Sequence, residues 1–190
     1  MTLLQLDYLD VLSKQGIMSP YDQRDVRETV LHTLPLRYGA VTDIAPDIRL
    51  TLHNAGHILG SSLVHLHIGE GIHNLVYTGD YKFGRTMLLE SAITDFPRVE
   101  TIITESTYGA SQDMMPSRME AERNLTSIIN ETLDRKGKVL IPVPAVGRAQ
   151  EIMLIIDGYM RRGLLKEAPV FIEGMISEAT AIHTAYPEYL

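Results

Sequence analysis

Three side chains that can do chemistry stand just after apolar runs in residues 52–109. His57 lies in NAGHILGS, Asp80 ends the run VYTGD, and Glu105 follows the apolar run in IITESTYG. Side chains in such places lie at the rim of a sheet, where strands stop and loops carry functional groups. Imidazole and carboxylate groups are both zinc ligands, and Asp80 could bridge two ions. The pattern indicates part of a metal-dependent hydrolytic site.

The residues alone also allow an interpretation without a metal. Glycines flank His57 in GHILG, which permits a tight turn and leaves the imidazole free to point outwards. A carboxylate such as Asp80 at the end of a buried strand is costly unless it is paired or metal-bound. The alternative is a capping aspartate beside a packed histidine. His65 and His67 form an HxH pair, which we expect on the outer face of a strand rather than on a metal.

The composition of the chain limits the class of protein to which it can belong. The chain has 190 residues, enough for one domain or for one domain and part of a second, and no cysteine. Disulfides, thiolate metal sites and a cysteine nucleophile are therefore excluded, so zinc would need His, Asp or Glu ligands. The net charge of −7 argues against a protein that coats nucleic acid, but not against local binding of a phosphate chain. The chain shows neither a membrane-length apolar run nor a signal peptide, so we expect a cytoplasmic protein without membrane contact.

The spacing of apolar residues, which changes between helical and strand periods along the chain, predicts an α/β fold in two parts. Residues 1–109 form an α+β part, with helices at 3–14 and from 19, and strands at 36–44, 48–53, 61–68, 72–78 and 101–104. Residues 110–190 alternate helix and strand, which predicts a parallel α/β layer. Its expected elements are helices at 116–135, 147–162 and 177–185 and strands at 138–143 and 170–173.

Four segments in order carry a family resemblance: HNAGHILGSSLVHL, YTGDYKFGRTMLL, ITESTYG and IPVPAVGRAQEIMLII. The chain resembles the metallo-β-lactamase-fold nucleases that contain an inserted β-CASP domain. It is most similar to the archaeal relatives of the cleavage and polyadenylation specificity factor endonuclease, a group linked to transcription termination. The resemblance covers essentially the whole chain. It implies a partial metallo-β-lactamase fold in residues 1–109 and the start of the β-CASP domain in residues 110–190.

The resemblance also implies roles for single residues. His57 matches a zinc-ligating histidine, Asp80 the aspartate that bridges two zinc ions, and Glu105 an acid that supports a catalytic histidine. Substrate contacts are expected from Lys82, Arg85, Tyr108 and Arg148. The implied ligand is RNA, expected to be single-stranded. The implied protein partners are a second copy of the chain or the transcription and RNA-processing machinery.

Several family motifs are missing from the chain. It lacks the HxHxDH motif, an early aspartate motif and two late β-CASP histidine motifs. We therefore expect an internal fragment of a zinc-dependent ribonuclease that hydrolyses RNA phosphodiester bonds in 3′-end processing or transcription termination. By itself the chain is expected to be inactive and to hold no stable two-zinc centre. The alternatives are a natural truncated paralogue, a non-catalytic scaffold or interaction subunit, and a nucleotide-binding domain centred on residues 142–148.

Overall fold

The structure is a computed structural model that describes residues 1–190 in two units, Met1–Arg37 and Tyr38–Leu190. The first unit contains helix α1 (Thr2–Gln15) and helix α2 (Gln23–Leu31). The second helix begins later than the Ser19-Pro20 pair predicted, because Asp22 is its N-cap. The Asp22 carboxylate accepts hydrogen bonds from the amides of Arg24 and Asp25, and the Asp25 carboxylate accepts one from the Asp22 amide. This capping box satisfies amides that would otherwise lack partners at the helix start.

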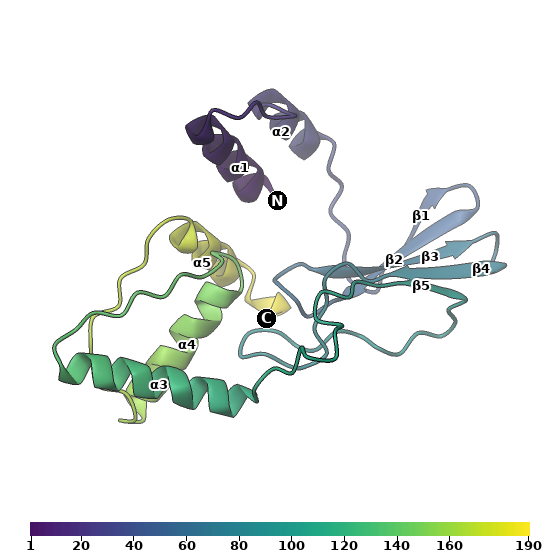
Figure 1. Cartoon of the computed structure of the whole chain (residues 1–190). Helices are drawn as coiled ribbons and strands as arrows, with labels where there is room; N and C mark the ends of the chain where they lie inside the picture. Colours follow the sequence, from purple (N-terminus) through teal and green to yellow (C-terminus); the bar gives the residue numbers. More distant parts are fainter. The chain divides into compact units, whose positions relative to one another are not determined.

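The second unit begins with a five-stranded sheet in the order β1-β2-β3-β4-β5 (Figure 1). Its strands are β1 (Val41–Ala45), β2 (Ile48–Asn54), β3 (Ser62–Ile68), β4 (His73–Tyr77) and β5 (Thr101–Ile103). The first four pair antiparallel, and β5 joins β4 in parallel. All five strands predicted for residues 1–109 are present, although β1 begins at Val41 rather than at 36. Gly39 adopts a φ of +73°, and this left-handed conformation interrupts the extended backbone just before Val41.

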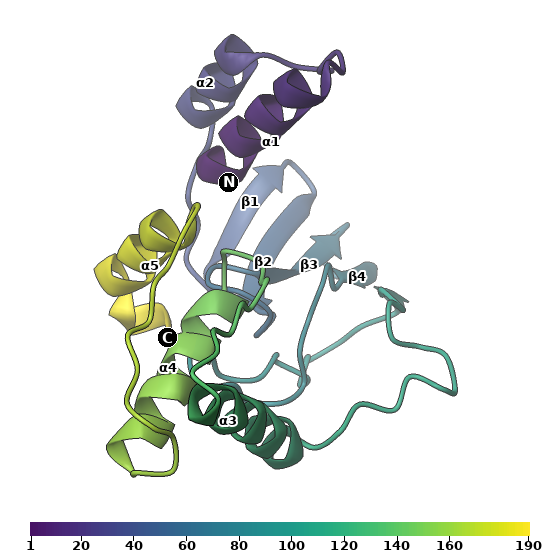
Figure 2. The same ribbon diagram turned by 60° about the vertical axis from the view of Figure 1, so that its left-hand side comes forward.

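Three longer helices follow the sheet. They are α3 (Arg118–Asp134), α4 (Arg148–Arg161) and α5 (Ile176–Ala185), followed by the short 3₁₀ helix η1 (Pro187–Tyr189). Helix α4 contacts both α3 and α5 (Figure 2). Ile129, Ile156 and Leu165 form the buried core among these helices. No helix of the protein has both the length and the apolar character that crossing a bilayer requires.

The parallel α/β layer predicted for residues 110–190 does not form. Neither 138–143 nor 170–173 is a strand, because neither segment has a hydrogen-bonded neighbour, and Leu140 and Phe171 are 91% and 83% exposed. Apolar β-rich segments favour strands, but an extended segment becomes a strand only when another segment pairs with it. The protein is therefore mixed α/β with a single mixed sheet. The predicted domain boundary near residue 109 stays a prediction.

The prediction that His65 and His67 lie on the outer face of a strand was wrong, because both lie on a face of the sheet that another segment covers. His65 is only 1% exposed, and its ring lies 4.1 Å from that of His67 and 5.7 Å from that of His53, measured between centroids. Phe96 packs edge-on against His53 and His65. The loop before β5 thus covers this face, and the local alternation of side chains could not reveal that cover.

Acid is expected to destabilise the fold through these buried histidines. Burial lowers the pKa of His53 and His65 below the ordinary 6.5, and the neighbouring His67 lowers both further. Below pH 6.5 the two histidines bind protons in the unfolded chain but not in the folded chain. Their contribution to the free energy of unfolding is therefore fully present above pH 6.5 and is lost as the pH falls through the lower pKa of the folded state. Urea midpoints at about pH 7.5 and about pH 5.5 should therefore differ, and differ less in His65→Phe.

The exposed His32 offers the control for this measurement. His32→Gln should keep the pH dependence of the wild-type chain. Equal midpoints for the wild-type chain at the two pH values would contradict the expectation.

Candidate functional site

The three side chains singled out in the sequence meet at one edge of the sheet. His57 Nε2 lies 3.7 Å from Asp80 Oδ2, and both side chains are accessible to solvent at 42% and 69% exposure. The pKa of Glu105 is lowered by hydrogen bonds from Thr107, by a backbone contact at Tyr81 and by the charge of His57. The Glu105 carboxylate therefore stays ionised beside the imidazole of His57.

The strand order explains this convergence. Tyr77 at the end of β4 pairs with Ile103 at the end of β5, and the Thr78 amide donates to the Ile103 carbonyl at 3.0 Å. Because β4 and β5 are parallel, their carboxyl ends meet, and Asp80 and Glu105 follow directly. The β2–β3 connection, which carries His57, lies at the same edge because β2 ends and β3 begins there.

Asn54 is a positioning residue that the sequence analysis missed. Its Nδ2 donates to the carbonyls of Glu90 and Ser91, each at 3.3 Å, and its Oδ1 accepts from the Gly56 amide at 2.9 Å. The turn that carries His57 is thereby held against the loop that carries Asp80. An Asn two residues before a Gly in a predicted turn is a typical Asx-turn signal, so the sequence did contain a hint.

Backbone contacts strengthen the same junction. The Lys82 amide donates to the Ala55 carbonyl and the Ala92 amide to the Lys82 carbonyl, both at 2.9 Å. On the other side of the turn, Ser61 Oγ accepts from the amides of His57 and Ile58 at 3.1 and 3.2 Å. Both loops are thus fixed in their backbones, while the His57 and Asp80 side chains stay open to solvent.

The His57–Asp80 pair fits two positions of a zinc site. Ligand atoms about 2.0–2.1 Å from a tetrahedral zinc ion lie about 3.3–3.4 Å apart, so the observed 3.7 Å needs only a small adjustment. A nitrogen and a carboxylate oxygen are also the donor types that zinc prefers in the absence of cysteine. No group of three or more His, Asp or Glu side chains in the chain is arranged to hold a metal ion.

The predicted substrate contacts separate into two groups. Burial lowers the pKa of Lys82 below its ordinary value, and the charge of Arg148 lowers it further; Glu151 acts in the opposite direction, and Arg118 has a smaller lowering effect. Arg85 instead forms an ion pair with Glu90 at 2.8 Å. Tyr108 is 69% exposed on the turn after Glu105. Arg118 was not singled out in the sequence, because it lies on a helix that begins nine residues beyond Gly109.

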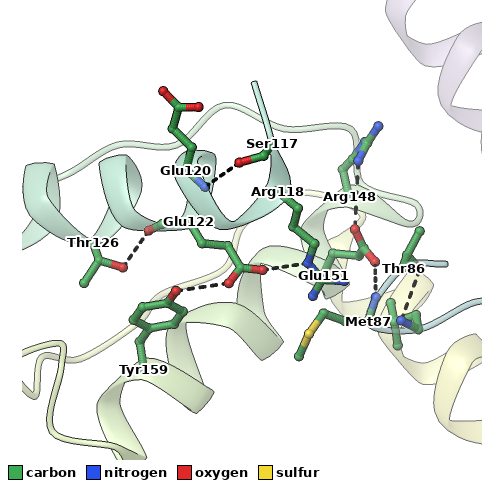
Figure 3. Close-up of polar contacts among 11 residues, drawn as sticks. Thr86, Met87, Ser117, Arg118, Glu120, Glu122, Thr126, Arg148, Glu151 and Tyr159 are labelled. Carbon is green, nitrogen blue, oxygen red and sulfur yellow. Dashed lines mark hydrogen bonds and ion pairs between the residues drawn. The ribbon is translucent and has the colours of Figure 1, made fainter. Parts of the chain in front are cut away.

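Figure 3 shows how the arginines near this site are held. Arg118 Nε donates to Glu122 at 2.7 Å, and Tyr159 Oη donates to the other Glu122 oxygen at 3.1 Å, which links α3 to α4. Arg148 Nη1 lies 3.9 Å from Glu151. The Arg148 side chain is 60% exposed, so its guanidinium remains available to a ligand.

Comparisons with known proteins identify relatives of the whole chain. No family model matches. The chain is 60% identical over 190 residues to the transcription termination factor FttA of Methanocaldococcus jannaschii, 59% identical over 189 residues to that of Lokiarchaeum sp., and 58% identical over 190 residues to that of Thermococcus kodakarensis. Each alignment covers 100% of this chain but only 29–30% of the relative. The chain spans less than a third of these relatives, and at this identity over its full length it belongs to the family of archaeal transcription termination factor FttA.

Proposed function

We propose that the chain forms part of a zinc-dependent ribonuclease that acts in transcription termination. The convergence of His57, Asp80 and Glu105 at one sheet edge carries this proposal, since the sequence had marked all three from their separate positions. The relatives are named transcription termination factors, which supports the biological role. The metallo-β-lactamase fold and the start of a β-CASP domain are part of the same proposal.

His57 and Asp80 would hold zinc. When bound, zinc would supply a water-derived nucleophile near neutral pH. Because a catalytic zinc usually has three protein ligands, we assign the remaining ligands to the part of the relatives that this chain does not match. The ionised Glu105 would orient a proton-donating group at the leaving oxygen through a charge-assisted hydrogen bond.

Lys82 and Arg148 would bind the phosphates of single-stranded RNA. Burial and the charge of Arg148 disfavour the charged form of Lys82, and the Glu151 carboxylate offsets them only in part, so a bound phosphate would favour the charged form. Tyr108, exposed beside Glu105, offers an aromatic face on which an unpaired base could stack.

A chimeric protein tests the proposal. The chain would replace the matching segment of the Methanocaldococcus jannaschii relative, to which it is 60% identical. The chimera should cleave single-stranded RNA when zinc is present and stop when a chelator removes it, whereas the isolated chain should not cleave. Absence of RNA cleavage by both the chimera and the intact relative would reject the ribonuclease assignment.

A non-catalytic interaction subunit is the second candidate function. The observation that favours it is the exposed apolar surface on segments 138–143 and 170–173, where Leu140 and Phe171 stand open to solvent. Such side chains at an unpaired segment are typical of a surface that another protein covers. In this case transcription termination by the chimera would persist when Asp80 is replaced.

A further inference from the structure

One carboxylate joins helix α4 to the loop that carries Asp80. Glu151 Oε1 accepts a hydrogen bond from the Met87 amide at 2.7 Å, across 64 residues of sequence (Figure 3). The Glu151 side chain is only 15% exposed. A carboxylate that is largely shielded from water is costly unless its oxygens find donors, so this contact couples the position of Glu151 to that of the Met87 amide.

The loop is shaped to present the Met87 amide. Thr86 Oγ1 accepts from the amides of Leu88 and Leu89 at 3.2 and 2.8 Å, and the Thr86 amide donates to the Leu89 carbonyl at 2.9 Å. These bonds close a tight turn at 86–89 and leave the Met87 amide pointing away from the turn. Glu151 is its acceptor.

The start of α4 also lies against the turn that carries His57. Gly147, the N-cap of α4, has a φ of +82°, and a Cβ built there would lie 3.0 Å from Ile58 Cγ2. Ile58 directly follows His57. One helix end therefore contacts both loops that supply the candidate zinc ligands.

We propose that Glu151 is a positioning residue that holds the loop of Asp80 and Lys82 against α4. The hydrogen bond to Met87 carries the effect, rather than the ion pair with Arg148, because a 3.9 Å pair to a largely exposed guanidinium contributes little. The effect of the Glu151–Met87 hydrogen bond on catalysis rests on the proposed function. Its effect on the position of the loop does not, so the two effects can be tested separately.

Amide hydrogen exchange of the isolated chain tests the contact itself. Glu151→Ala removes the acceptor, so exchange at Met87 should speed up about tenfold, as expected for loss of a hydrogen bond to a charged group. Glu151→Gln retains an amide oxygen at the same place and should keep the protection within about threefold. Unchanged exchange at Met87 in Glu151→Ala would overturn the proposal.

Asp157 offers a matched control on the same helix. It pairs with Arg161, which lies on the same helix, at 2.9 Å, and its side chain is 52% exposed. Asp157→Ala should leave Met87 exchange unchanged. If it accelerated Met87 exchange as much as Glu151→Ala does, the effect would be general loosening of α4, and the proposal would fail.

RNA cleavage by the chimera is the second test of the positioning role of Glu151. Glu151→Ala should lower kcat about tenfold and raise KM, because the misplaced loop carries both Asp80 and Lys82. Glu151→Gln should restore most of kcat, because the loop is held in that variant. Equal losses of kcat in the two variants would refute a positioning role through the Met87 bond. If neither the chimera nor the intact relative cleaves RNA, the ribonuclease proposal is wrong. The exchange experiment still tests whether Glu151 binds the Met87 amide.

Discussion

Asp80→Asn is expected to lower RNA cleavage by the chimera about 100-fold or more. The substitution keeps the shape of the side chain but removes the negative charge and one oxygen at a position proposed to hold zinc. Replacing groups that merely support metal ligands costs about 10–100-fold in metal affinity or activity, and loss of a ligand should cost at least as much. The measurement is the initial rate of single-stranded RNA cleavage together with the zinc content after dialysis.

The fold should tolerate this substitution, because the Asp80 side chain is 69% exposed and its neighbour His57 is also open. The thermal midpoint of Asp80→Asn should therefore match that of the parent. Asp95 is an exposed aspartate in the loop before β5, and Asp95→Asn should retain full activity. Full cleavage and unchanged zinc content in Asp80→Asn would remove the residue from the site.

Gly56→Ala is expected to destabilise the chain by about 2–5 kcal/mol. Gly56 has a φ of +65°, and an added Cβ would lie 2.7 Å from the Glu90 carbonyl oxygen and 2.8 Å from the Ala92 amide nitrogen. Both obstructing atoms belong to backbone, so no side-chain rotation relieves the clash. The loss is a large share of the 5–15 kcal/mol that typical domains have, and urea unfolding measures it.

Gly158 is the matched control for this substitution. It lies within α4, and a Cβ built there meets no atom within 4 Å. Gly158→Ala should stabilise the chain by about 0.5–1 kcal/mol, because alanine has less freedom to lose on folding into a helix. A Gly56→Ala variant as stable as the parent would show that the two loops are not held together as the structure has them.

The sequence by itself determined the local elements of this protein and the three residues of the candidate site. Hydrophobic period and turn residues are local signals, and they predicted the long helices and the five strands that form, most of them within a few residues. His57, Asp80 and Glu105 were marked because each follows an apolar run. The family was also readable from the sequence, because four ordered segments are far more specific than any single motif.

Tertiary structure decided which elements pair and what covers them. Segments 138–143 and 170–173 have strand-like side chains but no neighbour, so their backbone stays unpaired. His65 is buried because Phe96, from a distant loop, packs over it. Asn54 and Glu151 act through hydrogen bonds that span 36 to 64 residues. Partners so far apart in sequence leave no periodic signal, since their meeting depends on how the whole chain closes.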